Sequence, residues 1–284
     1  MMVDEDDEAY DLIRRHLLRS RGFDVSGYSP SFFSRVVRKR IGRTNCRSSI
    51  EYVGYLRRNE KEVNELISSL SINVTDFFRD PGAFEELSSR VIRPLVLLKT
   101  ELGWSTLRIW SAGCATGQET YSLAMCVLEE LRKEGLSTNL VVRIIGTDLS
   151  KTALDFASTG VYSQEGVKGI PRRLLSEYFE KRESGFEASQ PLKRLIRFTS
   201  GNLLDQPTRS FFDLIVCRNV VIYFSRPMHD RVIDNFYQAL RPGGFLMLGR
   251  TETLMGPRRR LFVGIDHENR IFRKPEKSMS LSDP

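Results

Sequence analysis

The segment Ile109-Trp-Ser-Ala-Gly-Cys-Ala-Thr-Gly-Gln-Glu119 joins a short apolar run to a helical pattern. Leu107–Trp110 predicts a buried strand, and Glu119–Arg132 predicts a helix because its apolar residues recur at helical spacing. Between them, Gly113 and Gly117 permit a ligand to approach the backbone closely and permit a tight entry into the helix. The amides at the start of that helix suit a carboxylate. This strand, loop and helix are typical of an open α/β sheet, which binds its ligand beyond the carboxyl ends of the strands.

The spacing of the glycines restricts the kinds of ligand that the loop could bind. It is not the G-x-G-x-x-G of nicotinamide enzymes, and the chain has no G-x-x-x-x-G-K-[ST] for a nucleoside triphosphate. Asp148 closes a second predicted strand, Val141–Gly146, at the place from which an acidic side chain accepts hydrogen bonds from ribose hydroxyls. A ribose without phosphates is therefore indicated, although Asp148 could instead only cap the helix that follows.

Strands and helices alternate over the rest of this region. The alternation predicts an α/β domain whose parallel sheet is covered by helices on both faces. Ser150 can cap the helix that runs to Ala157. The further expected elements are strands at Leu192–Thr199, Phe212–Cys217 and Gly244–Leu248, a helix over about Pro227–Leu240, and a terminal antiparallel hairpin of Arg260–Gly264 and Arg270–Lys274.

The first 70 residues show helical patterns alone. An acidic start favours a helix that runs to about Leu18, and Ser31 can cap a helix over about Phe32–Ile41. Two more helical patterns cover Ile50–Arg58 and Lys61–Leu70. We therefore expect a small all-α domain over residues 1–72, a boundary near Ser71–Asp76, and a second domain over residues 73–284.

The expected helix over Phe32–Ile41 is amphipathic and basic. No acidic residue lies between Asp24 and Glu51, whereas that window holds Arg35, Arg38, Lys39, Arg40, Arg43 and Arg47. A step of 100° per residue places its apolar residues, Phe33, Val36, Val37 and Ile41, opposite Arg35, Arg38 and Lys39. The basic face either meets an acidic partner or is an ordinary solvated surface.

Composition excludes several classes of protein. With 40% hydrophobic and 28% charged residues, the 284-residue chain is neither disordered nor a membrane bundle. Its longest apolar run, Val91–Leu98, is far shorter than the roughly 20 residues that span a bilayer. Five acidic residues among the first eight oppose a secretory signal, so we expect a cytoplasmic protein. The four cysteines show no C-x-x-C spacing and the three histidines are scattered, which predicts neither a metal site nor disulfides.

Five segments in this order resemble the chemotaxis protein-glutamate methyltransferases of the CheR family. The resemblance implies a Rossmann-like sheet that binds S-adenosylmethionine and ends in an antiparallel hairpin, an all-α N-terminal domain, and a small β-subdomain inserted at about residues 178–198. The segments are Asn73-Val-Thr-Asp-Phe-Phe-Arg79, Trp110-Ser-Ala-Gly-Cys-Ala-Thr-Gly-Gln-Glu-Thr-Tyr-Ser122, Gly146-Thr-Asp148, Asn202-Leu-Leu204 and Cys217-Arg-Asn-Val-Val-Ile-Tyr-Phe224.

The resemblance also implies which residues contact S-adenosylmethionine and its product S-adenosylhomocysteine. Glu119 and a residue such as Arg79 could pair with the ammonium and the carboxylate of the cofactor's methionine end. Four members of the set have simpler explanations: Asn73 and Thr75 could cap a helix, Arg79 could be a surface charge and Leu203 could be core. The set, with Gly113 added from the loop, is Asn73, Thr75, Arg79, Gly113, Glu119, Asp148, Asn202, Leu203, Arg218 and Asn219.

In such enzymes the methyl group passes to a glutamate side chain. A glutamate with a pKa near 4.3 is already ionised at pH 7, so no general base is required. Arg93 matches an arginine proposed in the family to orient the substrate carboxylate, although it could equally be a surface charge before Pro94. Arg93 is therefore the candidate catalytic residue.

The implied partner is the cytoplasmic helical bundle of methyl-accepting chemoreceptors. Arg35, Arg38, Lys39 and Arg43 would meet its acidic surface, where electrostatics sets the encounter rate more than the affinity. The insert is shorter than in members that bind a receptor pentapeptide, so we expect recognition without that peptide. We also expect a monomer that neither binds nucleic acid nor inserts into a membrane. Departures from the family pattern are Gly-Arg-Thr-Glu252, where a Gly-His-Ser-Glu-like run is frequent, and Gln118, where an acid is frequent.

Two other functions remain open from the sequence. The basic helix and a pI near 9.3 would suit a nucleic-acid methyltransferase, although the strand that ends in Cys217-Arg-Asn219 lacks an Asp/Asn-Pro-Pro-Tyr signature. A non-catalytic module that keeps the cofactor fold is the second alternative, and the intact Gly113, Glu119 and Asp148 argue against it. The glycine spacing makes a nicotinamide dehydrogenase a distant third.

Overall fold

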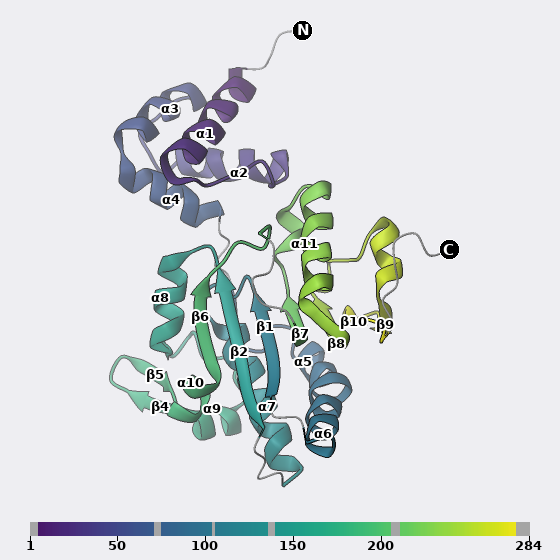
Figure 1. The fold of residues 1–284 in the computed structure, drawn as a ribbon. Coiled ribbons are helices and arrows are strands. Elements are labelled where there is room, and N and C mark those ends of the chain that lie inside the picture. Colours follow the sequence, from purple (N-terminus) through teal and green to yellow (C-terminus); the bar gives the residue numbers. More distant parts are fainter. Residues whose placement is uncertain (1–4, 71–74, 104–105, 136–139, 206–210, 277–284) are drawn as a thin grey trace. The chain divides into compact units, whose positions relative to one another are not determined.

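The computed structural model describes residues 5–70, 75–103, 106–135, 140–205 and 211–276 (Figure 1). The chain divides into two compact units. One comprises Met1–Asn73 with Ile222–His229, and the other Val74–Val221 with Asp230–Pro284. No helix within the described residues is both long enough and apolar enough to cross a membrane.

The first unit is built from helices, as predicted. They are α1 (Glu5–Arg21), α2 (Pro30–Ile41), α3 (Ser49–Arg58) and α4 (Glu60–Leu70). The cap of α2 differs from the prediction: the hydroxyl of Ser29 accepts the amide of Phe32, because Pro30 already occupies the first turn and begins the helix two residues early. The segment Ile222–His229 belongs to this unit because Tyr223 packs its ring 4.7 Å from that of Phe32.

One arginine of α2 faces inward rather than outward. Phe33, Val36 and Val37 are buried as predicted, and Phe32 is buried with them. Ile41, predicted for the same face, is only half-buried, and Arg40 takes the position of a core residue. Arg40 can be buried because its guanidinium makes two hydrogen bonds to the Glu62 carboxylate, at 2.9 and 2.7 Å. The hydroxyl of Tyr52 donates to the same carboxylate at 2.7 Å. Burial alone would raise the pKa of Glu62, but the hydrogen bonds from Arg40 and Tyr52 outweigh it and lower that pKa.

This buried pair gives a test of what holds the helical unit together. Glu62→Ala should lower the free energy of unfolding by about 3–5 kcal/mol, because it leaves the Arg40 guanidinium buried without its main partner. Glu65→Ala is the matched control: that carboxylate also contacts Arg40, at 3.3 Å, but its side chain is 52% exposed, so the loss should stay within about 1 kcal/mol. Urea denaturation of the full chain, followed by helical circular dichroism, measures both. Equal losses would contradict the assignment of the stability to the Glu62 pair.

The second unit contains a seven-stranded sheet in the order β6-β2-β1-β7-β8-β10-β9 (Figure 1). The pairs β1–β2, β2–β6, β1–β7 and β7–β8 are parallel, while β10 runs antiparallel to both β8 and β9. A parallel sheet with a terminal antiparallel hairpin is the predicted fold. The strands are β1 (Thr106–Ala112), β2 (Val141–Asp148), β6 (Ile196–Ser200), β7 (Phe212–Cys217), β8 (Leu240–Leu248), β9 (Val263–Asp266) and β10 (Ile271–Arg273).

Helices cover this sheet on both faces. All six residues of β7 are buried, and since successive side chains point to opposite faces, neither face of that strand meets solvent. The helices are α5 (Pro81–Leu87), a π-helical turn at Ser88–Ile92, α6 (Arg93–Glu101), α7 (Gln118–Lys133), α8 (Lys151–Thr159), α9 (Arg172–Tyr178), α10 (Gln190–Leu195) and α11 (Arg226–Ala239), with 3₁₀ turns at Val221–Tyr223 and Gly256–Leu261.

Two predicted strands are shorter than expected. Residues 192–195 are the end of α10 rather than the start of a strand, because Pro191 in the first turn begins a helix whose Leu192 is fully buried. The first strand of the hairpin starts at Val263 rather than Arg260, since Pro257 opens the 3₁₀ turn before it. In both places a proline starts a helical turn and delays the strand.

A separate antiparallel sheet of three strands lies in the insert. Its order is β3-β5-β4, formed by β3 (Val161–Tyr162), β4 (Phe179–Arg182) and β5 (Gly185–Ala188). The expected β-subdomain is therefore present, and it recruits β3 from before residue 178. Only two residues, 183 and 184, separate β4 from β5.

Candidate functional site

The loop between β1 and α7 can be formed only with glycine at two positions. Gly113 has φ +75° and Gly117 has φ +94°, both in the left-handed region. A Cβ on Gly113 would lie 2.6 Å from a methyl group of Val220, and one on Gly117 would lie 2.8 Å from the Cβ of Ala157. The amide of Gly113 donates to the carbonyl of Thr147 at 2.8 Å, which ties the loop to β2.

Asp148 ends β2 beside this loop. One carboxylate oxygen accepts the amide of Ala115 at 2.9 Å, and the other accepts the amide of Ser150 at 2.8 Å. Ser150, not Asp148, is the N-cap of α8, because its hydroxyl accepts the amide of Ala153. The simpler explanation of Asp148 as a helix cap is therefore wrong. Burial raises the pKa of Asp148, opposed by its backbone hydrogen bonds, and each oxygen keeps acceptor capacity for a ligand hydroxyl.

Glu119 lies in the first turn of α7 and is buried. The hydroxyl of Ser111 donates to one of its carboxylate oxygens at 2.9 Å. Burial raises the pKa of Glu119, and the positive charge of Arg218 opposes that rise. A buried carboxylate of this kind favours a cationic ligand group, which would offset the cost of burying its charge.

The turn after β7 carries two polar groups. The Arg218 side chain donates to the carbonyl of Arg79 at 2.8 Å and pairs with the carboxylate of Asp80. Its guanidinium carbon also lies 5.4 Å from the ring centroid of Phe84. Asn219 adopts φ +60°, and its buried amide oxygen has no hydrogen-bond partner among the described residues. A buried acceptor in that state is what a ligand donor would satisfy.

Two further candidates follow β6. The side-chain oxygen of Asn202 accepts the amide of Leu204 at 3.0 Å. Leu203 is buried, and its carbonyl accepts the side-chain amide of Asn235 at 2.9 Å. Because β6, β2, β1 and β7 are parallel neighbours, their carboxyl ends meet at one edge of the sheet. The fold thereby gathers at this edge residues that the sequence spreads widely: Gly113, Glu119, Asp148, Asn202, Leu203, Arg218 and Asn219.

The remaining cofactor candidates precede α5. Thr75 and Arg79 are half-buried, and the carbonyl of Arg79 joins this segment to Arg218. Asn73 lies outside the described residues. The interaction of Arg218 with the 79–80 backbone and side chain thus connects the segment before α5 to the carboxyl edge of the sheet.

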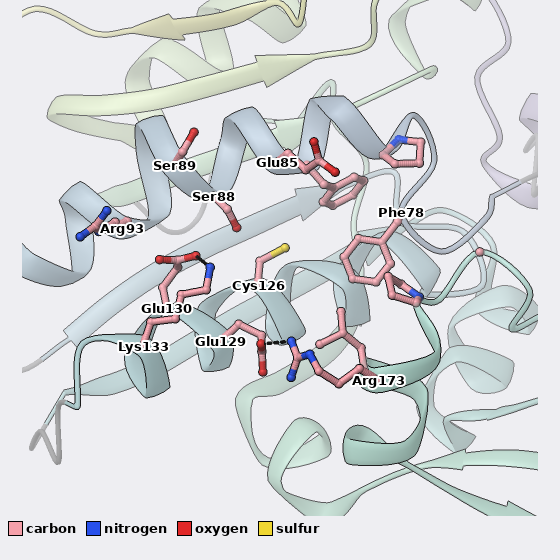
Figure 2. A pocket seen from close by; sticks show the side chains of 15 residues that line it. Phe78, Glu85, Ser88, Ser89, Arg93, Cys126, Glu129, Glu130, Lys133 and Arg173 are labelled. Carbon is pink, nitrogen blue, oxygen red and sulfur yellow. Dashed lines mark hydrogen bonds and ion pairs between the residues drawn. The ribbon is translucent and has the colours of Figure 1, made fainter.

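Arg93 is not part of this group. Its Nε donates to the Glu134 carboxylate at 2.7 Å, and its side chain is 55% exposed. Glu134 follows the last turn of α7 whereas Glu119 is in the first, a separation of about 22 Å along the helix axis at 1.5 Å per residue. Arg93 instead borders a separate pocket of about 450 Å³ between α5 and α7, with Glu130 and Lys133 nearby (Figure 2).

The four candidate substrate residues lie on or just after α2. Arg35, Arg38, Lys39 and Arg43 are exposed, as predicted. The guanidinium of Arg38 donates to the hydroxyl of Tyr10 at 3.1 Å, so this side chain is partly held by its own unit. Among the described residues, no group of three or more histidine, cysteine, aspartate or glutamate side chains is placed to hold a metal ion.

Sequence reasoning missed Glu252. The residue is only 2% exposed. Its two carboxylate oxygens accept hydrogen bonds at 2.6–3.0 Å from four backbone amides, those of Asn219, Val220, Val221 and Gly249. The sequence offered two signals, the acidic character of a residue that follows a buried strand and its place in the run Gly-Arg-Thr-Glu252, where the family frequently has a Gly-His-Ser-Glu-like run. Neither signal reveals which amides it meets.

Two family models match the chain and together cover most of it. One is described as the CheR methyltransferase SAM-binding domain and matches residues 73–268; the other is the CheR methyltransferase all-alpha domain and matches residues 8–71. The chain belongs to the CheR methyltransferase family. The resemblance noted from the sequence is thereby confirmed, and so is the fold of an all-α domain followed by an S-adenosylmethionine-binding methyltransferase domain.

Individual relatives agree with this assignment. A chemotaxis protein methyltransferase of Borreliella burgdorferi is 33% identical over 72% of this chain and 74% of its own. Chemotaxis protein methyltransferase 1 of Pseudomonas aeruginosa is 32% identical over 86% of this chain and 90% of its own. An uncharacterized 104.1 kDa protein of Rhodobacter capsulatus is 34% identical over 80% of this chain, which spans only 24% of that longer protein.

Solved structures are more distant. A glycopeptide N-methyltransferase complexed with S-adenosylhomocysteine is 12% identical, with a TM-score of 0.33, over 57% of this chain and 47% of its own. The family assignment rests on the family models and the relatives.

S-adenosylmethionine is the cofactor of this CheR family member, and the carboxyl edge of the sheet fits it. The two glycines let the loop pack directly against Val220 and Ala157, which fixes the backbone beside the site. The Asn219 amide oxygen is a buried acceptor without a described partner, and Glu119 is a buried carboxylate suited to an amino group. Asp148 would accept from the ribose hydroxyls.

Proposed function

We propose that this CheR family member transfers a methyl group from S-adenosylmethionine to glutamate side chains of chemoreceptors, forming glutamyl methyl esters. The observation that carries the proposal is that one chain joins the cofactor edge described above to an all-α domain, in the same combination as in the CheR family. Its relatives named as chemotaxis protein methyltransferases share both parts of the chain. Methylation in chemotaxis is their common function, and the glutamate target is the finer step proposed here.

The chemistry asks little of the protein beyond positioning. When bound, S-adenosylmethionine supplies an electrophilic methyl group on a sulfonium. A glutamate carboxylate is ionised at pH 7, so no residue of the chain needs to remove a proton. Orientation of the reactants can contribute up to about 7–11 kcal/mol, and it requires a cofactor that is held rigidly. The proposal therefore assigns catalysis to the rigidity of the carboxyl edge.

Individual roles follow from the contacts of each residue. Asp148 would hold the ribose hydroxyls and Glu119 the amino group. Arg218 would keep the segment before α5 against the site, because it already binds the Arg79 carbonyl and the Asp80 carboxylate. The further cofactor contacts that we propose are Asn73, Thr75, Arg79, Asn202, Leu203 and Asn219. The proposal gives Arg93 no catalytic role, since it pairs with Glu134 at the far end of α7.

A labelling experiment tests the function. Purified protein is incubated with S-adenosylmethionine that carries a radiolabelled methyl group, together with membranes that contain chemoreceptors. We expect label on the receptor band and its loss in mild base, because esters hydrolyse there and methylamines do not. Label that survives base, or label on added duplex DNA or RNA instead of the receptor, would contradict the proposal.

The proposed partner is the acidic helical bundle in the cytoplasmic part of a chemoreceptor, which a monomer of this chain would meet in the cytoplasm. Arg35→Glu with Lys39→Glu should lower the labelling rate about tenfold at low salt and weaken its dependence on salt, because charge at the rim of an interface governs the encounter rate. Arg143→Glu with Arg197→Glu, two exposed positions on β2 and β6, makes the same change of net charge and should alter the rate little. Initial rates at two or three salt concentrations measure this. Equal effects of the two pairs would mean that net charge, not the α2 face, attracts the receptor.

We further propose that recognition does not use a receptor pentapeptide. The family members that bind this peptide carry a longer loop with glycine in the insert, whereas here two residues join β4 to β5. Charged side chains also line the exposed edge strand: Arg182 pairs with Glu180 and Glu187, and such edges resist the addition of a further strand. Titration of the full chain with the pentapeptide in a calorimeter should show no binding up to about millimolar peptide. A dissociation constant in the micromolar range would overturn this part of the proposal.

A further inference from the structure

The Glu252 carboxylate organises the turn that follows β7. It lies after the end of β8, the neighbour of β7 in the sheet, and accepts the amides of three successive residues: Asn219 at 3.0 Å, Val220 at 2.8 Å and Val221 at 2.9 Å. A fourth amide, that of Gly249, donates at 2.6 Å. A single buried side chain thus satisfies four backbone donors that no strand or helix satisfies.

The Glu252 carboxylate approaches the turn at a place where only glycine fits at position 249. A Cβ on Gly249 would lie 2.7 Å from a Glu252 oxygen and 2.9 Å from the amide nitrogen of Asn219. Glycine at position 249 therefore lets the carboxylate approach the turn. An ionised acceptor suits this place because hydrogen bonds to a charged group are shorter and roughly twice as strong as neutral ones.

The turn that Glu252 holds is the one that faces the cofactor loop. Asn219 is kept at φ +60°, a left-handed conformation that, after glycine, asparagine adopts most readily. Its side-chain oxygen is buried and lacks a described partner. The next residue, Val220, touches the position where a Cβ of Gly113 would be. The conformation of three successive amides therefore decides both where the Asn219 acceptor points and how closely the turn packs on the glycine loop.

We propose that Glu252 is a positioning residue for the S-adenosylmethionine site: by binding the amides of residues 219–221 it fixes the turn whose Asn219 faces the cofactor and whose Val220 packs on Gly113. It acts through the turn and does not contact the cofactor itself. The inference rests on the proposed placement of the cofactor over Gly113 and Asn219.

A pair of matched variants separates positioning from general stability. Glu252→Gln turns one acceptor oxygen into a donor that opposes the amides, and it should raise the dissociation constant for S-adenosylhomocysteine at least about tenfold. Glu252→Asp, which keeps the charge but is one methylene shorter, should recover part of that affinity. The control is Asp213→Asn: Asp213 is 1% exposed on β7, the strand that the turn at residues 218–221 follows, and it accepts the amide of Arg108 at 2.8 Å. It should lower the melting temperature while it leaves the affinity unchanged.

Calorimetric titration with S-adenosylhomocysteine and thermal melting of each variant give four distinguishable results. The proposal is supported if affinity falls for Glu252→Gln and not for Asp213→Asn. It is overturned if Glu252→Gln leaves the affinity unchanged, or if the two variants lower it equally. If Asp148→Ala also leaves the affinity unchanged, the placement of the cofactor itself is wrong, which is a different failure.

A measurement on the unaltered protein decides the matter even if the variants do not fold. Before any cofactor is added, the amide protons of Asn219, Val220 and Val221 should exchange with solvent at least about a hundredfold more slowly than unprotected amides, because the carboxylate holds the turn in advance. Exchange at the unprotected rate, followed by protection only when S-adenosylhomocysteine binds, would show that the cofactor and not Glu252 orders the turn.

Discussion

Asp148→Ala should abolish detectable methyl transfer and raise the dissociation constant for S-adenosylhomocysteine at least about a hundredfold. Two hydrogen bonds from a ribose to a charged acceptor contribute about 1.5–3 kcal/mol each, and 1.4 kcal/mol corresponds to a factor of ten. The alanine also removes the acceptor of the Ala115 amide at 2.9 Å, so the glycine loop loses one of its ties to β2. Calorimetric titration gives the affinity, and the radiolabelling assay gives the rate.

The control for this substitution is Asp155→Ala. Asp155 lies on α8, the helix directly after Asp148, but its side chain is exposed. Its removal makes the same change of charge near the site and should leave affinity and rate within about twofold. A second variant, Asp148→Asn, keeps an acceptor and a side chain of the same shape, so it should retain more affinity than the alanine. If Asp148→Ala binds S-adenosylhomocysteine as tightly as the unaltered protein, the ribose does not lie at the end of β2.

Local patterns predicted the part of the fold in which neighbours in sequence are neighbours in structure. The strand, glycine loop and helix at residues 106–133 were predicted nearly to the residue, because apolar spacing and glycine conformation are local properties. Two errors in this local reasoning lie at prolines. Pro30 begins α2 two residues before the predicted start, and Pro191 lies in the first turn of α10, where the apolar pattern predicts the start of a strand. Those two starts could have been read from the sequence, since proline favours the first turn of a helix.

Contacts between distant residues were beyond the same reasoning. Glu252 binds amides about 30 residues earlier in the chain, and no periodicity connects the two segments. Arg40 belongs by composition to a basic face, yet Glu62 and Tyr52 draw it into the core. Arg93 matches a family position by sequence, but the direction of α7 carries its partner Glu134 away from the loop. The candidate cofactor residues at the ends of parallel strands are the exception. Their proximity could be predicted, because the alternation of strands and helices predicts a parallel sheet whose carboxyl ends lie together.

Glu119→Gln should change stability and cofactor affinity in opposite directions. The glutamine has the same shape and keeps an oxygen to accept the Ser111 hydroxyl. It removes a buried charge, so the cofactor-free protein should unfold at a higher temperature at pH 7. It also removes the negative partner of the cofactor's amino group, so the dissociation constant for S-adenosylhomocysteine should rise about 10- to 100-fold. A residue that served only the fold would not gain stability when its charge is deleted.

The pH dependence of these quantities follows from the raised pKa of Glu119. Because the folded, cofactor-free protein favours the protonated form, the stabilising contribution of Glu119 is present below its ordinary pKa and is lost as the pH rises through the raised value. Cofactor affinity has the opposite sign: it requires the carboxylate and should fall as the pH drops through that value. Both trends should disappear in Glu119→Gln. Glu130→Gln is the matched control, since Glu130 is 3% exposed on the same helix and pairs with Lys133 at 2.7 Å; it should lose stability and keep its affinity. An affinity for S-adenosylhomocysteine that is equally independent of pH in Glu119→Gln and the unaltered protein would mean that the amino group lies elsewhere.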